Sequence, residues 1–213
     1  MLLMQVQSMT RTLLAVLMIA GGLTGCAEMS VRDALPPAAH GVEIEGVKLD
    51  EKIFLARGVP PLILNGAGVR HKFLFLKIYV GSLYLVQKKH DRDAILADPG
   101  PKRVSMHILA DQVTAGDLIS SMNNALAENL VPHQLAMLEK RLSKLNEMMS
   151  SVGAIKKGSV VHLDYIPAAG TRISIDGEVK LTIPGADFYR AMLHIWIGAK
   201  PVDGRLRDAM LGG

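Results

Sequence analysis

Residues 64–86 read "LNGAGVRHKFLFLKIYVGSLYLV", and the fold follows from this stretch. The run 72–86 is apolar on both faces, which predicts a central strand in a sheet that is covered on each side. Residues 61–64, "PLIL", predict a further strand, and the glycines between the two runs predict a turn that joins them. We therefore expect a domain built around a sheet.

Arg70 lies between this glycine segment and the apolar strand. An arginine is costly there unless its five donors are used, and its planar fork suits a carboxylate or a phenolate. The pattern alone favours a structural ion pair of Arg70 with an internal acid, and a pocket for an anion is the alternative. A phosphate cradle is disfavoured, because a dinucleotide-binding turn needs a third glycine and a helix directly behind it.

Alternating or apolar runs on both sides of this stretch predict the remaining strands. They lie at 42–49, 52–56, 103–110, 159–166, 171–176 and 178–183. The last two runs flank Asp176 and Gly177, and alternation around Asp-Gly is a strong local signal of a hairpin. The sheet is thus expected to be antiparallel.

Two amphipathic helices are predicted in the middle of the chain. The first spans 114–130, where Thr114 and Asp117 form a capping-box pattern and apolar residues recur along one stripe. Pro132 ends it, and a second apolar stripe spans 135–149. The short link between them predicts that the two helices are antiparallel and pack on the sheet.

Two shorter helices are predicted after the last strand, at 184–198 and 201–211. The order is therefore strands, two long helices, a hairpin and two short helices. This order defines an α+β domain with an antiparallel sheet, which we place at 42–213.

The N-terminus is expected to be a lipoprotein signal peptide, residues 1–25. The apolar run 13–20 follows Arg11 and is too short for a stable transmembrane helix. The segment "LTGC" at 23–26 resembles a bacterial lipobox, in which the cysteine carries the lipid. Cys26, the only cysteine in the chain, is therefore the expected lipidation site.

A lipid on Cys26 would anchor the domain to a membrane, because acyl chains contribute about 0.8 kcal/mol for each buried methylene. Ala27 follows, not Asp, which by resemblance to sorted lipoproteins implies the outer membrane and a periplasm-facing domain. Residues 26–41 lack apolar periodicity and contain a Pro-Pro pair, so they are expected to be a lipidated tether. Whether Met1 or Met9 is the true start is open.

Composition and spacing argue against several kinds of site. Of the 24 Lys and Arg residues, Arg11 lies in the signal peptide, which leaves 23 against 20 acids, or +3, and disfavours nucleic acid as a partner. The seven histidines never occur two together at ligand spacing, so no metal and no cofactor is predicted. No serine motif for nucleophilic catalysis is present. Asp164 and Tyr165 are expected to close a turn.

The segments "LNGAGVR" (64–70), "KIYVGSLYL" (77–85) and "ADFYRAMLHIWIGAKPVDGRLRDAMLG" (186–212) together resemble the chalcone isomerase-like family, and specifically its bacterial branch. The resemblance covers 42–212. It implies an open-faced β-sandwich with a large antiparallel sheet covered by helices, which agrees with the order of elements above.

The resemblance also implies site residues. Arg70 falls where plant chalcone isomerases use an arginine to hold the phenolate of the substrate during ring closure. Tyr79 occupies the position of their catalytic threonine. Asn129 matches their helical asparagine, whereas Met122 and Ala125 stand where they place a tyrosine and a lysine. Losing such donors would cost on the order of a hundredfold or more each.

Non-enzymatic relatives that bind fatty acids resemble the chain better, because they keep the arginine and present a tyrosine. The leading hypothesis is therefore a membrane-tethered binding protein in which Arg70 and Tyr79 grip the carboxylate of a fatty acid or similar amphipathic ligand in an apolar cleft, with Asn129 as a further ligand-binding residue. The alternative is an isomerase acting on a chalcone-like enone or phenol. A third hypothesis is a structural lipoprotein with a filled core.

Overall fold

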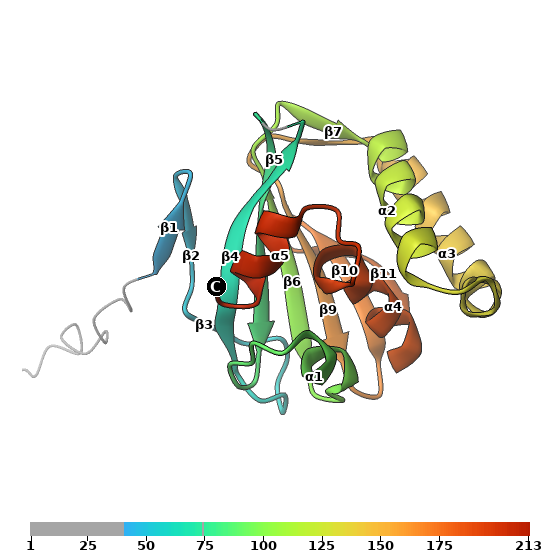
Figure 1. The fold of residues 1–213 in the computed structure, drawn as a ribbon, viewed down its shortest axis with the longest axis horizontal. Helices are drawn as coiled ribbons and strands as arrows, with labels where there is room; N and C mark the ends of the chain where they lie inside the picture. The colour runs from blue at the N-terminus through green and yellow to red at the C-terminus, as the bar shows by residue number, and fades with distance from the viewer. Residues whose placement is uncertain (1–40, 74) are drawn as a thin grey trace, which may run out of the picture. The chain divides into compact units, whose positions relative to one another are not determined.

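The computed structural model describes residues 41–73 and 75–213 (Figure 1). The signal peptide, the lipidation site at Cys26 and all of the tether except Gly41 lie outside the described residues. The described residues belong to one compact unit. None of the helices in this part of the chain is long and apolar enough to cross a membrane.

The centre of the domain is a seven-stranded sheet in the order β11-β10-β9-β6-β5-β4-β3. Its strands are β3 (Lys52–Ile53), β4 (Leu62–Lys72), β5 (Leu76–Leu85), β6 (Lys102–Ile108), β9 (Val160–Ile166), β10 (Gly170–Ile175) and β11 (Glu178–Ile183). Every pair of neighbours is antiparallel, which confirms the predicted α+β class with a large antiparallel sheet. β5 is buried without interruption over 78–85, as its two-sided apolar pattern predicted.

The predicted glycine turn is wrong. β4 runs straight through "NGAG", and the connection to β5 lies instead at 73–75, with irregular register at Leu64/Gly66 and Arg70/His71. The glycines serve packing: a Cβ added to Gly66 would lie 2.0 Å from the Ala209 carbonyl oxygen. Glycine inside a strand often marks such a close backbone approach.

The helical predictions are confirmed with small shifts at the ends. The helices are α1 (Arg92–Ala97), α2 (Ala115–Asn129), α3 (Pro132–Val152), α4 (Ala186–Ile197) and α5 (Gly204–Met210), of which α1 was not predicted. Thr114 caps α2, because its hydroxyl oxygen accepts a hydrogen bond from the Asp117 N–H at 3.1 Å. α2 and α3 are antiparallel neighbours, shown in yellow-green and yellow in Figure 1.

Two small antiparallel ladders lie outside the main sheet. The segment 42–49, predicted as one strand, is a hairpin of β1 (Val42–Ile44) and β2 (Val47–Leu49), because Glu45 and Gly46 adopt positive φ angles and turn the chain. The second ladder joins β7 (Gln112–Thr114) to β8 (Ala154–Lys156). It ties the start of α2 to the end of α3.

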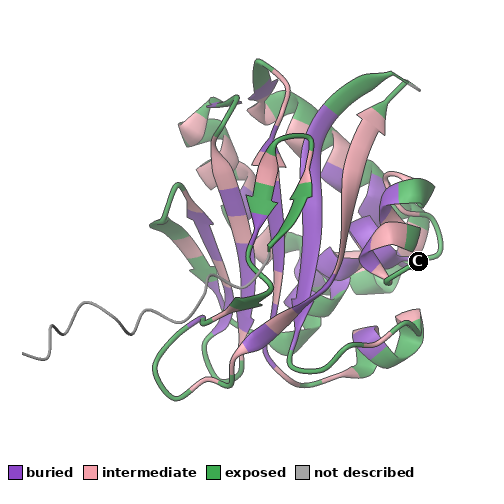
Figure 2. Ribbon diagram, turned by 90° about the vertical axis from the view of Figure 1, so that its left-hand side faces the viewer, coloured by how far each residue is buried: buried purple, intermediate pink, exposed green. Residues whose placement is uncertain are grey.

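The sheet has a separate core on each face, and β5 contributes to both. Tyr79, Leu83 and Leu85 belong to the larger core beneath the helices. Val80 and Tyr84 point the other way, into a smaller core with the segment that contains β1, β2 and β3. Figure 2 shows the buried residues running through the strands between the two faces.

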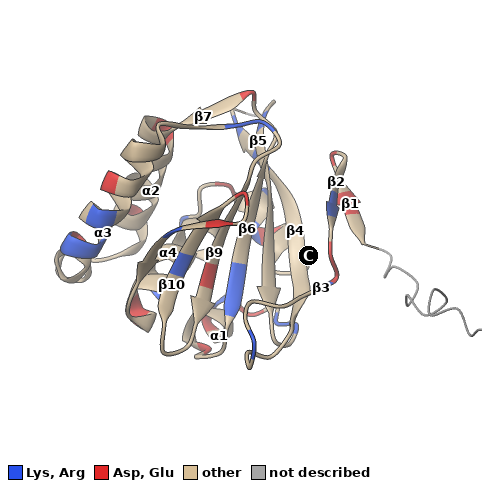
Figure 3. Cartoon of the chain, turned by 180° about the vertical axis from the view of Figure 1, so that it is seen from behind, with Lys and Arg blue, Asp and Glu red and all other residues tan. Residues whose placement is uncertain are grey.

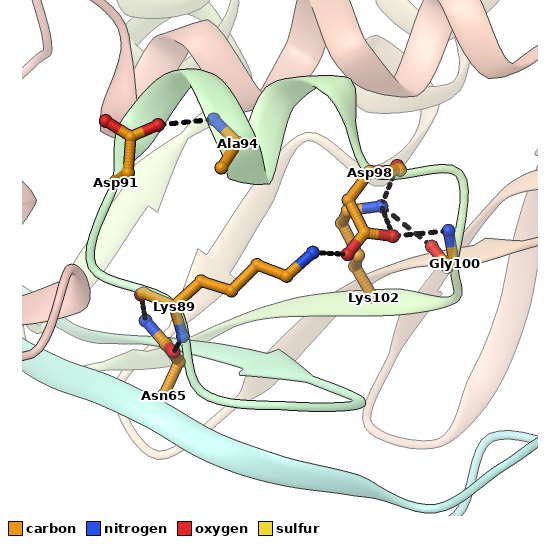
Figure 4. A network of polar contacts seen from close by, with 7 residues as sticks. All are labelled: Asn65, Lys89, Asp91, Ala94, Asp98, Gly100 and Lys102. Carbon is orange, nitrogen blue, oxygen red and sulfur yellow. Dashed lines mark hydrogen bonds and ion pairs between the residues drawn. The ribbon is translucent and has the colours of Figure 1, made fainter.

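A polar network near α1, at the lower end of Figure 1, joins β4 to the segment that connects β5 and β6. The Asn65 side chain donates to the Lys89 carbonyl at 2.9 Å and accepts from the Lys89 N–H at 2.8 Å (Figure 4). Asp98 forms ion pairs with Lys89 and Lys102. Lys102 is only 2% exposed, and its burial lowers the pKa of its ammonium group to about 8, although Asp98 opposes the shift.

Candidate functional site

An apolar inner cavity of about 80 Å³ lies between the helix-covered face of the sheet and helices α2, α3 and α4. Five methionines line it: Met106, Met122, Met148, Met149 and Met192. The remaining lining is mostly aliphatic, and its polar groups come from Arg70, Tyr79, Ser121 and Trp196. Such a site, apolar with a few convergent polar groups, is the usual form of a small-molecule pocket.

Arg70 reaches the inner cavity from β4. It is the cross-strand partner of Tyr79, so the two side chains leave the sheet on the same face. The pairing register of β4 with β5 changes directly after Arg70, between Arg70 and His71. There the His71 N–H donates to the Asp203 carboxylate at 2.9 Å. This register shift therefore lies next to the residue whose guanidinium contacts Ser121 of α2.

The guanidinium of Arg70 has few partners. Its Nη2 donates to the Ser121 hydroxyl at 2.7 Å, and its carbon lies 5.5 Å from the centroid of the Tyr79 ring. Its Nε–H is buried, and no residue in the described part of the chain accepts from it. No carboxylate among the described residues lies within ion-pair distance of Arg70, so the expected structural ion pair is wrong.

Tyr79 supplies a second donor beside Arg70. It is 2% exposed, and its hydroxyl oxygen accepts a hydrogen bond from the Trp196 indole at 2.9 Å. Burial raises the pKa of Tyr79, and the nearby positive charge of Arg70 only partly opposes the shift. The phenol is therefore protonated at neutral pH, and its O–H can donate to an acceptor in the cavity.

An outer cleft of about 330 Å³ adjoins the inner cavity. The two share Arg70 and Ser121, and the outer cleft is also lined by Lys72, Leu76 and Asp117. The hydrogen bond between Arg70 and Ser121 therefore lies at the boundary between a polar vestibule and an apolar interior. This placement suits an amphipathic ligand whose polar end stays at the boundary.

The structure does not bring Asn129 to this site. Its side-chain amide donates to the carbonyls of Ala125 and Lys200, each at 2.7 Å, and its oxygen accepts from the Lys200 N–H at 2.9 Å. It thus joins the end of α2 to the loop after α4. Arg70 and Tyr79, in contrast, are brought together, and their ligand-binding role stays a prediction.

Ser121 and Trp196 were missed by the sequence reasoning. Ser121 directly precedes Met122 of the predicted apolar stripe. A serine at the edge of such a stripe is usually solvated, so nothing in the sequence indicated that Ser121 would contact Arg70. Trp196 is the only tryptophan in the chain and lies in the apolar helix α4. A buried tryptophan usually finds an acceptor for its N–H, which is the signal that could have linked it to a polar group.

The opposite face of the sheet carries a separate polar row. Asp164 and Tyr165, predicted to close a turn, lie inside β9. Asp164 is fully buried there and pairs with Arg103 and Arg172 at 2.8 Å each. Figure 3 shows basic and acidic positions side by side on β6, β9 and β10. His162 contacts the Ser105 hydroxyl at 2.8 Å, and burial lowers its pKa to about 4. In the described part of the chain, no His, Cys, Asp or Glu cluster is placed to hold a metal ion.

The chain belongs to the chalcone isomerase-like family, whose model matches residues 41–212. The predicted family is thereby confirmed, and its bacterial branch stays a prediction. The crystal structure of a fatty-acid binding protein from Arabidopsis thaliana has the same fold, with a TM-score of 0.63 and 15% identity over 80% of this chain and 95% of that one. At this identity the likeness concerns the fold alone. No curated protein matches the chain.

Proposed function

We propose that this chalcone isomerase-like protein binds a fatty acid or a similar amphipathic carboxylate, with Arg70 and Tyr79 holding the head group. The observation that carries the proposal is the buried Arg70 Nε–H, which has no acceptor among the described residues and belongs to the cross-strand partner of the protonated Tyr79. Buried donors are rarely left unpaired in proteins, because each one costs free energy. A carboxylate supplies two oxygens and could accept from both groups.

The apolar tail would lie among the methionines of the inner cavity. At about 80 Å³ this cavity is smaller than the 300–1,000 Å³ typical of ligand pockets, so a long tail requires side chains to move. Methionine has three rotatable bonds and adapts to irregular shapes, which makes such a lining expandable. We expect the ligand to displace methionine side chains while the sheet stays fixed.

The fatty-acid binding protein of Arabidopsis thaliana supports this function because it shares the fold. The isomerase alternative uses the same pair, since two donors could also stabilise an oxyanion during ring closure. However, Met122 and Ala125 stand where the enzymes place a tyrosine and a lysine, and Asn129 is bonded to the loop after α4 and does not line the inner cavity. The geometry therefore favours binding.

The proposal includes the lipid anchor. The "LTGC" motif at 23–26 supports lipidation of Cys26 and removal of residues 1–25, and Ala27 supports sorting to the outer membrane. The domain would then face the periplasm on the tether 26–41. Metabolic labelling with an alkyne-bearing fatty acid checks this: Cys26→Ser should abolish the label, and a label that persists in this variant would contradict the anchor.

The binding function is tested on residues 27–213, which contain the compact unit and omit the apolar N-terminal run. Lipid extracts of the purified domain are compared by mass spectrometry with those of Arg70→Met, and palmitate binding is measured by titration calorimetry. We expect a fatty acid near one per chain in the wild type and strong depletion in Arg70→Met.

Lys72→Met is the matched control, because Lys72 borders the outer cleft but not the inner cavity. It should retain the fatty acid. A wild-type domain that carries none and does not bind palmitate would overturn the proposal. Cyclisation of a chalcone above the buffer rate, lost in Arg70→Met, would establish the isomerase instead.

A further inference from the structure

The connection between β4 and β5 carries exposed apolar side chains that the fold does not use. Phe73 is 73% exposed, Phe75 82% and Leu76 45%. Phe73 also has a φ of 51°, a conformation that glycine or asparagine adopts at lower cost. A turn selected only to join two strands would have other residues here. We call Phe73, Phe75 and Leu76 the apolar tip.

The apolar tip stands at the end of a protruding two-stranded ribbon. β4 and β5 pair as far as Lys72 and Leu76, whereas the pairing of β5 with β6 stops at Tyr79 and Ile108. The ribbon therefore extends beyond the neighbouring strand. Figure 2 shows its end coloured as exposed, at the upper right of the view.

Lysines surround the apolar tip. Lys72 and Lys77 flank it, and their only ion pairs in the described chain are exposed ones with Asp117 and Glu45, a kind of pair that contributes little. The exposed Lys156 and Lys157 lie at the same end of the sheet, because Gln112 pairs with Lys156 and Ala110 donates to the carbonyl of Ile78. Acidic residues lie among them at the same end of the sheet: Glu45, Asp111, Asp117, Asp176 and Asp203.

The apolar tip also borders the entrance to the binding site. Leu76 of the tip and Lys72 beside it line the outer cleft, together with Arg70. A surface that receives the tip would therefore lie next to the vestibule of the inner cavity. A ligand that leaves such a surface would reach Arg70 through the outer cleft.

We propose that the apolar tip inserts into the surface of a lipid bilayer, so that an amphipathic ligand passes between the membrane and the cavity. The proposed docking to the bilayer is argued from the apolar tip alone, and only the ligand transfer rests on the proposed function. A specific protein partner typically buries about 800 Å² on each side, which the three described side chains of the tip do not offer. Apolar side chains flanked by lysines suit the boundary between acyl chains and head groups.

Insertion is tested with a fluorophore. Residues 27–213 lack cysteine, so Phe75→Cys and Phe54→Cys each accept a single environment-sensitive label. Phe54 is a matched control: it is 68% exposed and follows β3, which pairs with the opposite end of β4. On vesicles of phosphatidylcholine mixed with phosphatidylglycerol, the label at 75 should shift to the blue and the label at 54 should not.

Affinity for the same vesicles is measured by co-sedimentation. The double variant Phe73→Ser with Phe75→Ser should bind about tenfold more weakly or worse, because two apolar anchors are lost. Phe54→Ser should bind as the wild type does. Lys72→Gln with Lys77→Gln should weaken binding to the mixed vesicles while leaving binding to pure phosphatidylcholine unchanged.

Equal vesicle binding by the wild type and the double phenylalanine variant would overturn the proposal. A blue shift of the label at 75 that depends on protein concentration without vesicles would also overturn it, in favour of contact with a second copy. Arg70→Met should bind vesicles normally. The outcome for docking is therefore independent of whether the cavity binds a fatty acid.

Discussion

Within residues 41–73 and 75–213, the side chain of Arg70 has one hydrogen-bond partner, Ser121, although its guanidinium has five donors. Strand β4 places Arg70 beside Tyr79. Trp196 of helix α4 donates its indole N–H to the Tyr79 hydroxyl oxygen. Arg70 and Tyr79 both line the apolar inner cavity, and each keeps a donor that no described residue accepts. Unpaired donors of this kind can bind a ligand, but they do not stabilise the folded state.

Replacing Arg70 is therefore expected to leave the fold intact or to stabilise it. In domain stripped of lipid, Arg70→Met should keep or raise the free energy of unfolding, by up to about 2 kcal/mol, because a buried unpaired donor is removed and apolar area is added. Urea denaturation of Arg70→Met against Lys72→Met measures the difference. A loss above about 1 kcal/mol would show that Arg70 is structural.

At the scale of elements, α5 packs on β4 on the same face of the sheet as the inner cavity. The glycines of β4 let α5 lie directly on the strand, and the N-cap residue of α5, Asp203, also accepts from the His71 N–H beside Arg70. The same short helix therefore packs on the strand and supports the register shift next to the guanidinium.

A methyl group at Gly66 should disturb this contact. The added Cβ would lie 2.0 Å from the Ala209 carbonyl oxygen, which is backbone and cannot rotate away. We expect Gly66→Ala to lower the free energy of unfolding by about 1–3 kcal/mol, the usual range for overpacking. Gly204→Ala, where nothing lies within 4 Å of the added Cβ, is the control and should be neutral in thermal and urea denaturation.

At the scale of the whole molecule, stability should depend on pH through Lys102. Its folded pKa of about 8 lies below the ordinary 10.5, because burial disfavours the charged form. Between these two values the unfolded chain binds more protons than the folded one, so the free energy of unfolding must rise with pH. From pH 8 to pH 9.5 we expect a gain of about 1–2 kcal/mol.

Urea denaturation at intervals across this range measures the gain. Lys102→Met removes the titrating group and should give a nearly flat profile over the same interval. If the wild-type profile is flat or falls, Lys102 keeps its ordinary pKa despite its burial. The range ends below pH 10, because burial raises the pKa of Tyr79 and Tyr189 in the folded state, so that ionisation of these tyrosines in the unfolded chain near pH 10 would lower the free energy of unfolding.

Local patterns in the sequence were enough to predict most elements. Alternation around Asp176 and Gly177 predicted the hairpin of β10 and β11, and Thr114 with Asp117 predicted the start of α2. Such signals are reliable because the physics behind them, turn geometry and capping, acts over four or five residues. The family resemblance then placed Arg70 and Tyr79 together.

Only the tertiary structure decided what the glycines of β4 are for and what surrounds Arg70. Gly66 looked like a turn residue because the helix that packs on it lies more than 130 positions later in the chain. The partners of Arg70 and Tyr79, Ser121 and Trp196, come from two different helices, and Asn129 is held by a distant loop instead of the cavity. Local patterns determine elements because those interactions are local, whereas a cavity depends on which distant side chains packing brings together.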